Sequence, residues 1–187
     1  MSTRISQITG HLFLSSAGAI SHNRLHTLGI TQIVNCTIEI PSVVMPGVET
    51  VRIQLDDVPA SRLEVFFDKC ADRIHQVHGY GGKTLVHCVA GVSRSASLCI
   101  AYLMKYHRMS LRQAFYHVRN CRHIINPNIG FWRQLIDYER RLYGQATVKI
   151  VSSNLGHVPD VYIEKKKPMA YFPSFLIETE HSLCHKQ

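Results

Sequence analysis

A cysteine and an arginine, Cys88 and Arg94, stand six residues apart with only small or apolar residues between them. A short apolar and β-branched run at 83–86 precedes them, and an apolar run from Leu98 to Met104, long enough for a helix, follows. This order predicts a strand, a loop and then a helix, with the loop turning into the first turn of the helix.

A loop of this kind has a definite chemistry. Its backbone N–H groups point inward, and together with the helix dipole they form a site for a dianionic phosphate. Gly91 and its small neighbours let the backbone come close to such an anion. A thiol held beside N–H groups and a cation is kept as the nucleophilic thiolate, which is the state expected for Cys88. Arg94 offers a planar fork that can hold two phosphate oxygens and keeps its charge.

The pattern of a histidine, a cysteine, five residues, an arginine and a serine resembles the protein tyrosine phosphatase superfamily. The match is fullest with the atypical, low-molecular-weight dual-specificity phosphatases, because segments 101–105 and 127–131 look like the helices that follow the loop there, and 158–162 looks like part of their C-terminal extension. The resemblance implies a cysteine-dependent protein phosphatase that hydrolyses phosphotyrosine and phosphoserine or phosphothreonine through a phosphocysteine, without cofactor or metal.

The resemblance also assigns roles within the loop. His87 is expected to keep the loop in shape, and Ser95 to donate a hydrogen bond to the Cys88 sulfur. The residues expected to bind phosphate are Val89, Ala90, Gly91, Val92, Ser93 and Arg94.

A phosphatase also needs an acid to protonate the leaving group, and the resemblance implies an aspartate upstream of the loop. Asp56 and Asp57 are the candidates, at the end of a run in which Val51, Ile53 and Leu55 alternate with polar residues. If that alternation continues, Asp57 shares their face and Asp56 points to solvent. The family pattern, an acid two residues before a proline, also selects Asp57. Asp57 is the favoured acid and Asp56 remains the alternative.

Strand-like and helix-like segments alternate along the chain, which predicts an α/β fold of the protein tyrosine phosphatase type, with a central mixed, mostly parallel sheet flanked by helices. Strands are expected at 12–14, 30–35, 51–55 and 84–87. Helices are expected at 63–78 with a capping box at Ser61 and Glu64, at 98–104 in the buried centre, after Ser110 with a capping box to Gln113, and at 128–143.

The chain of 187 residues is expected to form one catalytic domain over residues 1–144. Residues 145–187 show few periodic signals and carry three consecutive lysines at 165–167, so they are expected to be an extension that is packed on the surface or partly disordered. The short apolar run at 171–177 beside these lysines could meet an acidic partner or a membrane surface.

The formal net charge of +8 favours anionic partners, and phosphorylated proteins, mitogen-activated protein kinases among them, are the expected ones. No nucleic-acid motif accompanies the charge, so no nucleic-acid partner is expected. Six cysteines without a Cys-x-x-Cys pair argue against a structural zinc site or a disulfide framework. The sequence shows no secretory leader and no apolar stretch of transmembrane length, and the oligomeric state is not encoded in any pattern.

These features indicate a cytoplasmic protein that could also enter the nucleus. Mitochondrial association is the alternative, because no acidic residue precedes Glu39 and the first thirty residues are rich in Ser and Thr. Two other functions stay open. The same loop could hydrolyse a phosphoinositide or an RNA phosphate, although its uncharged spacer favours protein substrates, or the domain could bind phosphoproteins without cleaving them.

Overall fold

The computed structural model describes residues 4–154 and 156–163. Its centre is a five-stranded sheet in the order β1-β2-β5-β3-β4, in which β1 runs antiparallel to β2 and the other neighbours are parallel. The strands of this sheet are β1 (Ser6–Gln7), β2 (Leu12–Ser16), β3 (Gln32–Asn35), β4 (Glu49–Arg52) and β5 (Thr84–Cys88). The expected α/β class with a mixed, mostly parallel sheet is therefore confirmed.

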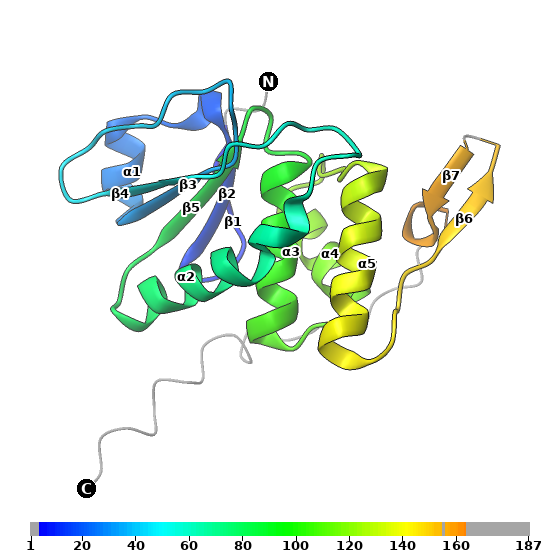
Figure 1. The fold of residues 1–187 in the computed structure, drawn as a ribbon. Coiled ribbons are helices and arrows are strands. Elements are labelled where there is room, and N and C mark those ends of the chain that lie inside the picture. Colours follow the sequence, from blue (N-terminus) through cyan, green and yellow to red (C-terminus); the bar gives the residue numbers. More distant parts are fainter. Residues whose placement is uncertain (1–3, 155, 164–187) are drawn as a thin grey trace, which may run out of the picture.

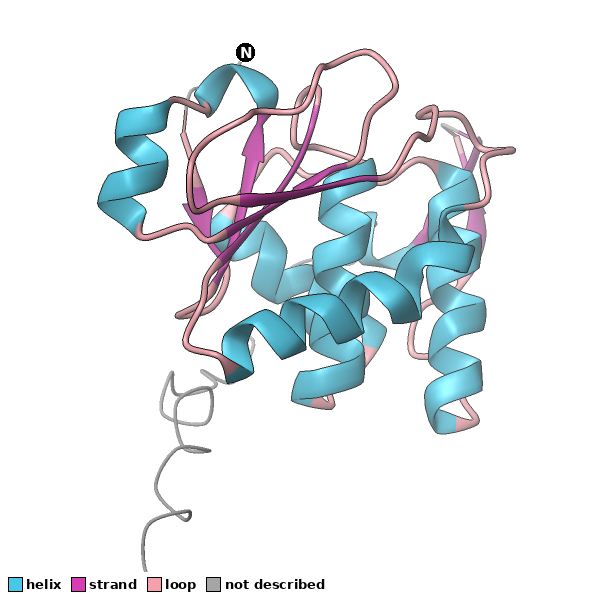
Figure 2. Ribbon diagram, turned by 60° about the vertical axis from the view of Figure 1, so that its left-hand side comes forward, coloured by secondary structure: helices cyan, strands magenta, loops and turns pink. Residues whose placement is uncertain are grey.

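Helices cover both faces of the sheet unequally (Figures 1 and 2). One small helix, α1, lies against one face, and a group of four helices lies on the other. Because parallel strands need crossover connections, helices fall on both sides and the central strands are buried throughout. The helices are α1 (His22–Leu28), α2 (Phe67–Gly79), α3 (Arg94–His107), α4 (Leu111–Cys121) and α5 (Ile129–Tyr143).

Side chains alternate between two cores along the central strands. Val34 and Val86 belong to the large core under α2 to α5, whereas Ile33 and Leu85 belong to the smaller core under α1. Helix α3 occupies the middle of the large core. Every residue from Leu98 to Met104 is buried, as the apolar sequence predicts, and the polar first turn from Arg94 to Ser97 is buried as well. The loop before α3 thus stands on a rigid helix.

The ends of two helices confirm their sequence signals. The Ser110 hydroxyl accepts from the Gln113 backbone at 3.2 Å while the Gln113 side chain accepts from the Ser110 backbone at 3.0 Å, which is the expected capping box. At α5, the Asn128 side chain accepts from the Phe131 backbone, and Gly144 ends the helix in the left-handed conformation.

Two expectations are wrong in detail. The strand expected at 51–55 lies at Glu49–Arg52, where its register is set by pairing with β3. The capping box expected at Ser61 does not form, because the chain first makes a 3-10 turn, Leu63–Phe66. The Gln134 side chain of α5 contacts both residues instead, donating to the Ser61 carbonyl at 2.8 Å and accepting from the Glu64 backbone at 2.9 Å.

After α5 the chain forms an antiparallel hairpin of β6 (Ile150–Ser153) and β7 (Gly156–Pro159), followed by a short 3-10 turn, Asp160–Tyr162. This segment is anchored on the helices. Arg112 of α4 pairs with Asp160 at 2.8 Å, and Trp132 of α5 donates to the Tyr162 hydroxyl at 3.1 Å. The lysine cluster and the apolar run at 171–177 lie outside the described residues. Within the described ranges, no helix is both long and apolar enough to cross a membrane.

Candidate active site

The loop from Cys88 to Arg94 joins the end of β5 to the start of α3, as its sequence predicts. Gly91 adopts φ of 67° in this loop, in the left-handed region that favours glycine. A Cβ atom at this position would lie 2.5 Å from the carbonyl carbon and oxygen of Ser15 at the end of β2. The loop is thus pressed against the neighbouring strand, and a side chain at Gly91 would displace it.

Four consecutive loop carbonyls face outward, each onto a donor from another part of the chain. The Val89 carbonyl accepts from the Ala17 backbone at 3.1 Å and the Val92 carbonyl from the Asn126 backbone at 2.9 Å. The two carbonyls between them, of Ala90 and Gly91, accept from the Arg122 guanidinium at 3.0 and 2.7 Å. In a trans peptide the C=O and N–H groups point in opposite directions. The N–H groups of Ala90, Gly91, Val92 and Ser93 are therefore directed inward, where they form a cradle for an anion.

The Cys88 sulfur lies at the floor of this cradle with a side chain only 2% exposed. It accepts hydrogen bonds from the Gly91 backbone at 3.2 Å and from the Ser95 hydroxyl at 3.1 Å. The first residues of α3 stand beside it. Two donors and a helix N-terminus place positive potential at the sulfur, which suits a thiolate nucleophile.

Arg94 is held so that one edge of its guanidinium is left for a ligand. Its Nη1 donates to the Leu55 carbonyl at 2.9 Å and to the Glu39 carboxylate at 3.0 Å, and its Nη2 donates to Glu39 at 3.3 Å. Its Nε has no hydrogen-bond partner within the described residues. The Nε and Nη2 edge can therefore bind two oxygens of a phosphate at once.

Glu39 is the counter-ion of this arginine and was not expected from the sequence. Burial of Arg94 opposes its charge, but the hydrogen bonds and charge of Glu39 outweigh that effect and raise the pKa of Arg94. The same hydrogen bonds lower the pKa of the Glu39 carboxyl. The loop that carries Glu39 is held in turn by Arg52, which donates to the carbonyls of Thr37 and Ile38 at 3.3 and 2.7 Å.

Asp57 lies in the loop after β4, and its side chain reaches the free edge of the Arg94 guanidinium. Its Oδ1 accepts from the Ser93 hydroxyl at 2.7 Å and from the Asn128 side chain at 2.8 Å. Its Oδ2 lies 3.6 Å from Nε of Arg94. One oxygen is thus anchored and the other faces the free edge of the arginine. Asp56 is exposed and has no interaction with the loop residues.

The side chains of Ser93 and His87 bond to groups that surround the cradle, which for His87 is the contact expected from the sequence. Ser93 points toward Asp57 rather than into the cradle, and it accepts from the Asn128 backbone at 3.1 Å. His87 is fully buried and lies with Nδ1 3.3 Å from the Cys88 carbonyl. Burial lowers the pKa of His87, so its imidazole is neutral and Nδ1 is the donor to that carbonyl.

Arg122, Asn128 and Glu39 are the residues that sequence reasoning missed in these roles. Asn128 carried a signal, since it stands in the family-like segment 127–131 and opens a helix. The other two carried none, because their partners are more than thirty residues away along the chain.

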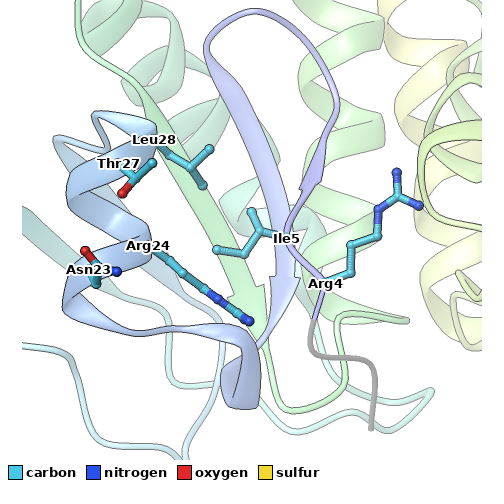
Figure 3. A pocket seen from close by; sticks show the side chains of 6 residues that line it. All are labelled: Arg4, Ile5, Asn23, Arg24, Thr27 and Leu28. Carbon is cyan, nitrogen blue, oxygen red and sulfur yellow. The ribbon is translucent and has the colours of Figure 1, made fainter.

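Two further observations concern possible metal sites and cavities in the described part of the chain. No group of three or more His, Cys, Asp or Glu side chains there could hold a metal ion. A shallow cavity of about 350 Å³ lies between α1 and the residues just before β1, on the face opposite the large core. Figure 3 shows the Arg4 side chain directed away from the residues of α1 that line it, which are Asn23, Arg24, Thr27 and Leu28.

Comparison with known proteins agrees with this geometry. The family model described as the dual specificity phosphatase catalytic domain matches residues 12–141. Human dual specificity protein phosphatase 14 is 53% identical over 165 residues, covering 87% of this chain and 83% of that protein. Mouse dual specificity protein phosphatase 18 is 46% identical over 167 residues, covering 88% of each. The crystal structure of human DUSP28 matches with a TM-score of 0.72 and 36% identity, covering 74% of this chain and 94% of that one.

The fold and the loop define a cysteine-based phosphatase of the protein tyrosine phosphatase class. Within that class, this chain belongs to the dual specificity phosphatase family and is a dual-specificity protein phosphatase.

Proposed function

We propose that Cys88 is the nucleophile of this phosphatase and that the inward N–H groups of residues 90–93 bind the phosphoryl oxygens. The observation that carries this proposal is the set of four outward carbonyls, from Val89 to Val92, each held by a donor from outside the loop. Because these contacts hold the peptide groups before substrate arrives, the N–H dipoles need little reorganisation as charge develops on the phosphoryl group.

Arg94 binds the phosphoryl group beside these amides. Its free Nε and Nη2 edge takes two oxygens, while Glu39 and the Leu55 carbonyl keep Nη1 in place. A bidentate contact of this kind fixes the phosphorus in line with the Cys88 sulfur and stabilises the charge of the transition state.

Asp57 protonates the leaving oxygen through Oδ2. Its other oxygen is anchored by Ser93 and Asn128, so the carboxyl group is oriented before the reaction. The sulfur of Cys88 forms a bond to phosphorus as the bond to the leaving oxygen breaks, and Asp57 supplies the proton.

A water molecule then attacks the phosphocysteine. Asp57, now a carboxylate, accepts a proton from this water as the S–P bond breaks and inorganic phosphate leaves. Ser95, whose hydroxyl lies 3.1 Å from the sulfur, donates to the departing thiolate and favours its release.

The substrates we propose are phosphorylated proteins, and mitogen-activated protein kinases are the first to test. The uncharged spacer from Val89 to Ser93 supports protein substrates over phosphoinositides, because it offers no lysine to a multiply phosphorylated headgroup. We place this activity in the cytoplasm, with access to the nucleus.

Replacement of the nucleophile tests the proposal. Cys88→Ser should abolish hydrolysis of an aryl phosphate, and Cys70→Ser is the matched control, since Cys70 is also a buried thiol but lies on α2, outside the loop. Turnover of Cys88→Ser close to that of the wild type would exclude the covalent route. Incubation of Cys88→Ser with diphosphorylated kinase should retain the kinase on the protein, and loss of retention in Cys88→Ser/Arg94→Ala should follow.

A further inference from the structure

The cavity of about 350 Å³ between α1 and the residues just before β1 takes no part in the proposed reaction, and we call it the α1 cavity. Ile5 and Leu28 lie on its two sides (Figure 3) and also pack on the small core under α1, so they give the cavity an apolar wall. The other side chains that line it are exposed to solvent, and they are those of Arg4, Asn23, Arg24 and Thr27.

The elements around the α1 cavity contribute positive charge and no negative charge. Arg24 lies along one end of the cavity, with Nη1 donating to the Ala19 carbonyl at 3.0 Å, and Arg4 lies at the opposite edge (Figure 3). No acidic residue precedes Glu39 in the sequence, so β1, β2 and α1 carry no carboxylate. Glu39 itself pairs with Arg94 at 3.0 Å. Such a surface attracts anionic groups.

The register of the sheet places the α1 cavity at the same end as the active site. β1 and β2 are antiparallel, and Ser6 lies opposite Leu14. Two residues before Ser6, Arg4 comes opposite Ser16. Ser16 is in turn the β5 partner of Cys88. Two strand spacings of about 4.8 Å therefore separate the backbones of Arg4 and Cys88, which is about 10 Å in all.

Hydrogen bonds join both sides of the α1 cavity to the catalytic loop, residues 88–94. On one side, the Arg4 carbonyl accepts at 3.1 Å from the Arg122 guanidinium, which also donates to two carbonyls of the loop. On the other side, the 3-10 turn that precedes α1 begins at Ala17, whose backbone donates to the Val89 carbonyl at 3.1 Å. The position of the cavity relative to the loop is therefore fixed.

This position limits what can fill the cavity during catalysis. A molecule that lies in the α1 cavity while its phosphate is at Cys88 must extend about 10 Å beyond that phosphate. A phosphoprotein extends that far, whereas a small phosphate ester does not. A flat membrane surface does not enter a hollow between a helix and a strand. A protein segment with carboxylates and an apolar side chain matches both the charge and the apolar wall.

We propose that the α1 cavity is a docking site for an acidic segment of the phosphoprotein substrate that also carries an apolar side chain. Arg24 and Arg4 attract its carboxylates, and Ile5 and Leu28 contact its apolar side chain. This inference rests on the proposed function, because the docked protein is the substrate of Cys88. A second contact of this kind raises the effective concentration of the phosphorylated residue at the loop and leaves the chemistry there unchanged.

Three variants test the charge of the α1 cavity. Asn23→Asp/Thr27→Glu adds two negative charges at exposed positions of α1 that the reaction does not use, and Thr27→Lys adds a positive charge instead. Lys69→Glu is the matched control. It changes the net charge by the same amount as the double variant, but it lies on the exposed surface of α2, on the other face of the sheet.

The measurement is kcat/KM on three substrates. They are an aryl phosphate, a whole diphosphorylated mitogen-activated protein kinase, and a peptide of about five residues around its phosphorylation site, which reaches only about 7 Å to either side. With the kinase, Asn23→Asp/Thr27→Glu should lower kcat/KM about tenfold, through KM. Thr27→Lys should raise it about twofold, the effect of one exposed ion pair. Both effects should fade at high salt.

The two smaller substrates report on the catalytic loop alone, because neither reaches the α1 cavity. All variants should hydrolyse the aryl phosphate and the short peptide as the wild type does, and Lys69→Glu should also match the wild type with the kinase. A merely structural effect of the substitutions would not improve activity in Thr27→Lys, nor would it be confined to the whole protein.

Four results would overturn the inference. Equal kcat/KM of the wild type for the kinase and for the short peptide would show that no docking contact forms. Equal kinase rates for the wild type and Asn23→Asp/Thr27→Glu would exclude this cavity. A loss of the same size on the aryl phosphate would make the cavity a support of the loop. Weaker binding of the double variant to phosphatidylserine vesicles, with unchanged kinase rates, would assign the cavity to a membrane.

Failure of the proposed function is a separate outcome. It would appear as turnover of the aryl phosphate by Cys88→Ser, and no docking contact takes part in that assay.

Discussion

The side chain of Asn128 joins the start of α5 to the loop after β4 by donating to Oδ1 of Asp57 at 2.8 Å. The same Asn128 caps α5 through its side-chain oxygen, which accepts from the Phe131 backbone at 3.0 Å. One side-chain amide thus caps α5 through its oxygen and holds the proposed acid through its nitrogen.

Replacement of Asn128 should separate these two tasks. Asn128→Ser keeps a capping oxygen but is too short to reach Asp57, so it should lower kcat by about tenfold, the effect of one lost hydrogen bond to a charged group, and leave the unfolding free energy almost unchanged. Asn128→Ala should lose kcat to the same extent and also about 1 kcal/mol of stability. Equal kcat for Asn128→Ser and the wild type would show that Ser93 alone orients Asp57.

Replacement of Asp57 should remove the proton from the leaving group. Asp57→Asn should lower kcat by about 10²- to 10³-fold for a phenyl phosphate, with a much smaller loss for an aryl phosphate whose leaving group is acidic. Asp56→Asn is the control, and an effect equal to or larger than that of Asp57→Asn would transfer the role to Asp56.

Arg122 should matter for both stability and phosphate binding. Its guanidinium is buried, which lowers its pKa, and it donates to the carbonyls of Ala90, Gly91 and Arg4. Arg122→Met leaves these carbonyls without donors and should cost about 2–4 kcal/mol in the unfolding free energy. Among folded molecules, inhibition by inorganic phosphate should weaken, because the loop amides lose their fixed direction.

Arg119→Met is the matched control for Arg122→Met. Arg119 lies in the last turn of α4, just before Arg122, but packs over the rings of Phe115 and Tyr162. It should leave phosphate inhibition unchanged. Urea unfolding and the inhibition constant measure the two effects separately, and an unchanged inhibition constant in Arg122→Met would limit this arginine to a packing role.

A methyl group at Gly130 should displace the loop that carries Asp57. A Cβ atom there would lie 2.0 Å from the Pro59 carbonyl oxygen, so α5 and this loop are in direct backbone contact. Gly130→Ala should therefore reduce kcat for phenyl phosphate more than for a substrate with an acidic leaving group. Gly79→Ala, where nothing lies within 4 Å of the new atom, should change neither rate.

Stability should decrease in acid because of His11. Burial, followed by the nearby His78, His107 and His75, lowers the pKa of His11 from 6.5 to about 3. Below pH 6.5 the unfolded chain binds a proton at His11 that the folded chain does not bind. The contribution of neutral His11 to the free energy of unfolding is therefore complete above pH 6.5 and is lost as the pH falls toward 3. The free energy of unfolding should fall by less than about 1.4 kcal/mol per pH unit through His11, since this side chain is partly solvated.

Urea unfolding between pH 7 and pH 5 measures this slope. In the wild type, Nε2 of His11 lies 2.7 Å from the Tyr102 hydroxyl. The glutamine of His11→Gln can also form a hydrogen bond to this hydroxyl, but glutamine does not titrate. The slope should become shallower in His11→Gln and persist in His22→Gln, a change on the exposed surface of α1. Part of it should remain in both variants, because burial also lowers the pKa of His87. Identical slopes for His11→Gln and the wild type would contradict this assignment.

Local spacing alone determined the loop from Cys88 to Arg94, the buried helix after it, the start of α4 and the ends of α5. These features depend on hydrogen bonds and packing between residues a few positions apart, so the pattern of residue types is enough to predict them. Asp57 was also selected from the sequence, but the strand alternation used for it ends at Arg52. Its position is set by Ser93 and Asn128.

Only the tertiary structure brought together the groups that surround the loop. Glu39 lies in the connection between β3 and β4 and meets Arg94 at the start of α3, whereas Arg122 follows α4 and meets the loop from beneath. Contacts of this kind follow from sheet order and from the crossing of helices over the sheet, which no short stretch of sequence contains. The nucleophile Cys88 and the phosphate-binding Arg94 can therefore be predicted from one segment of sequence, whereas the orientation of both side chains depends on the whole fold.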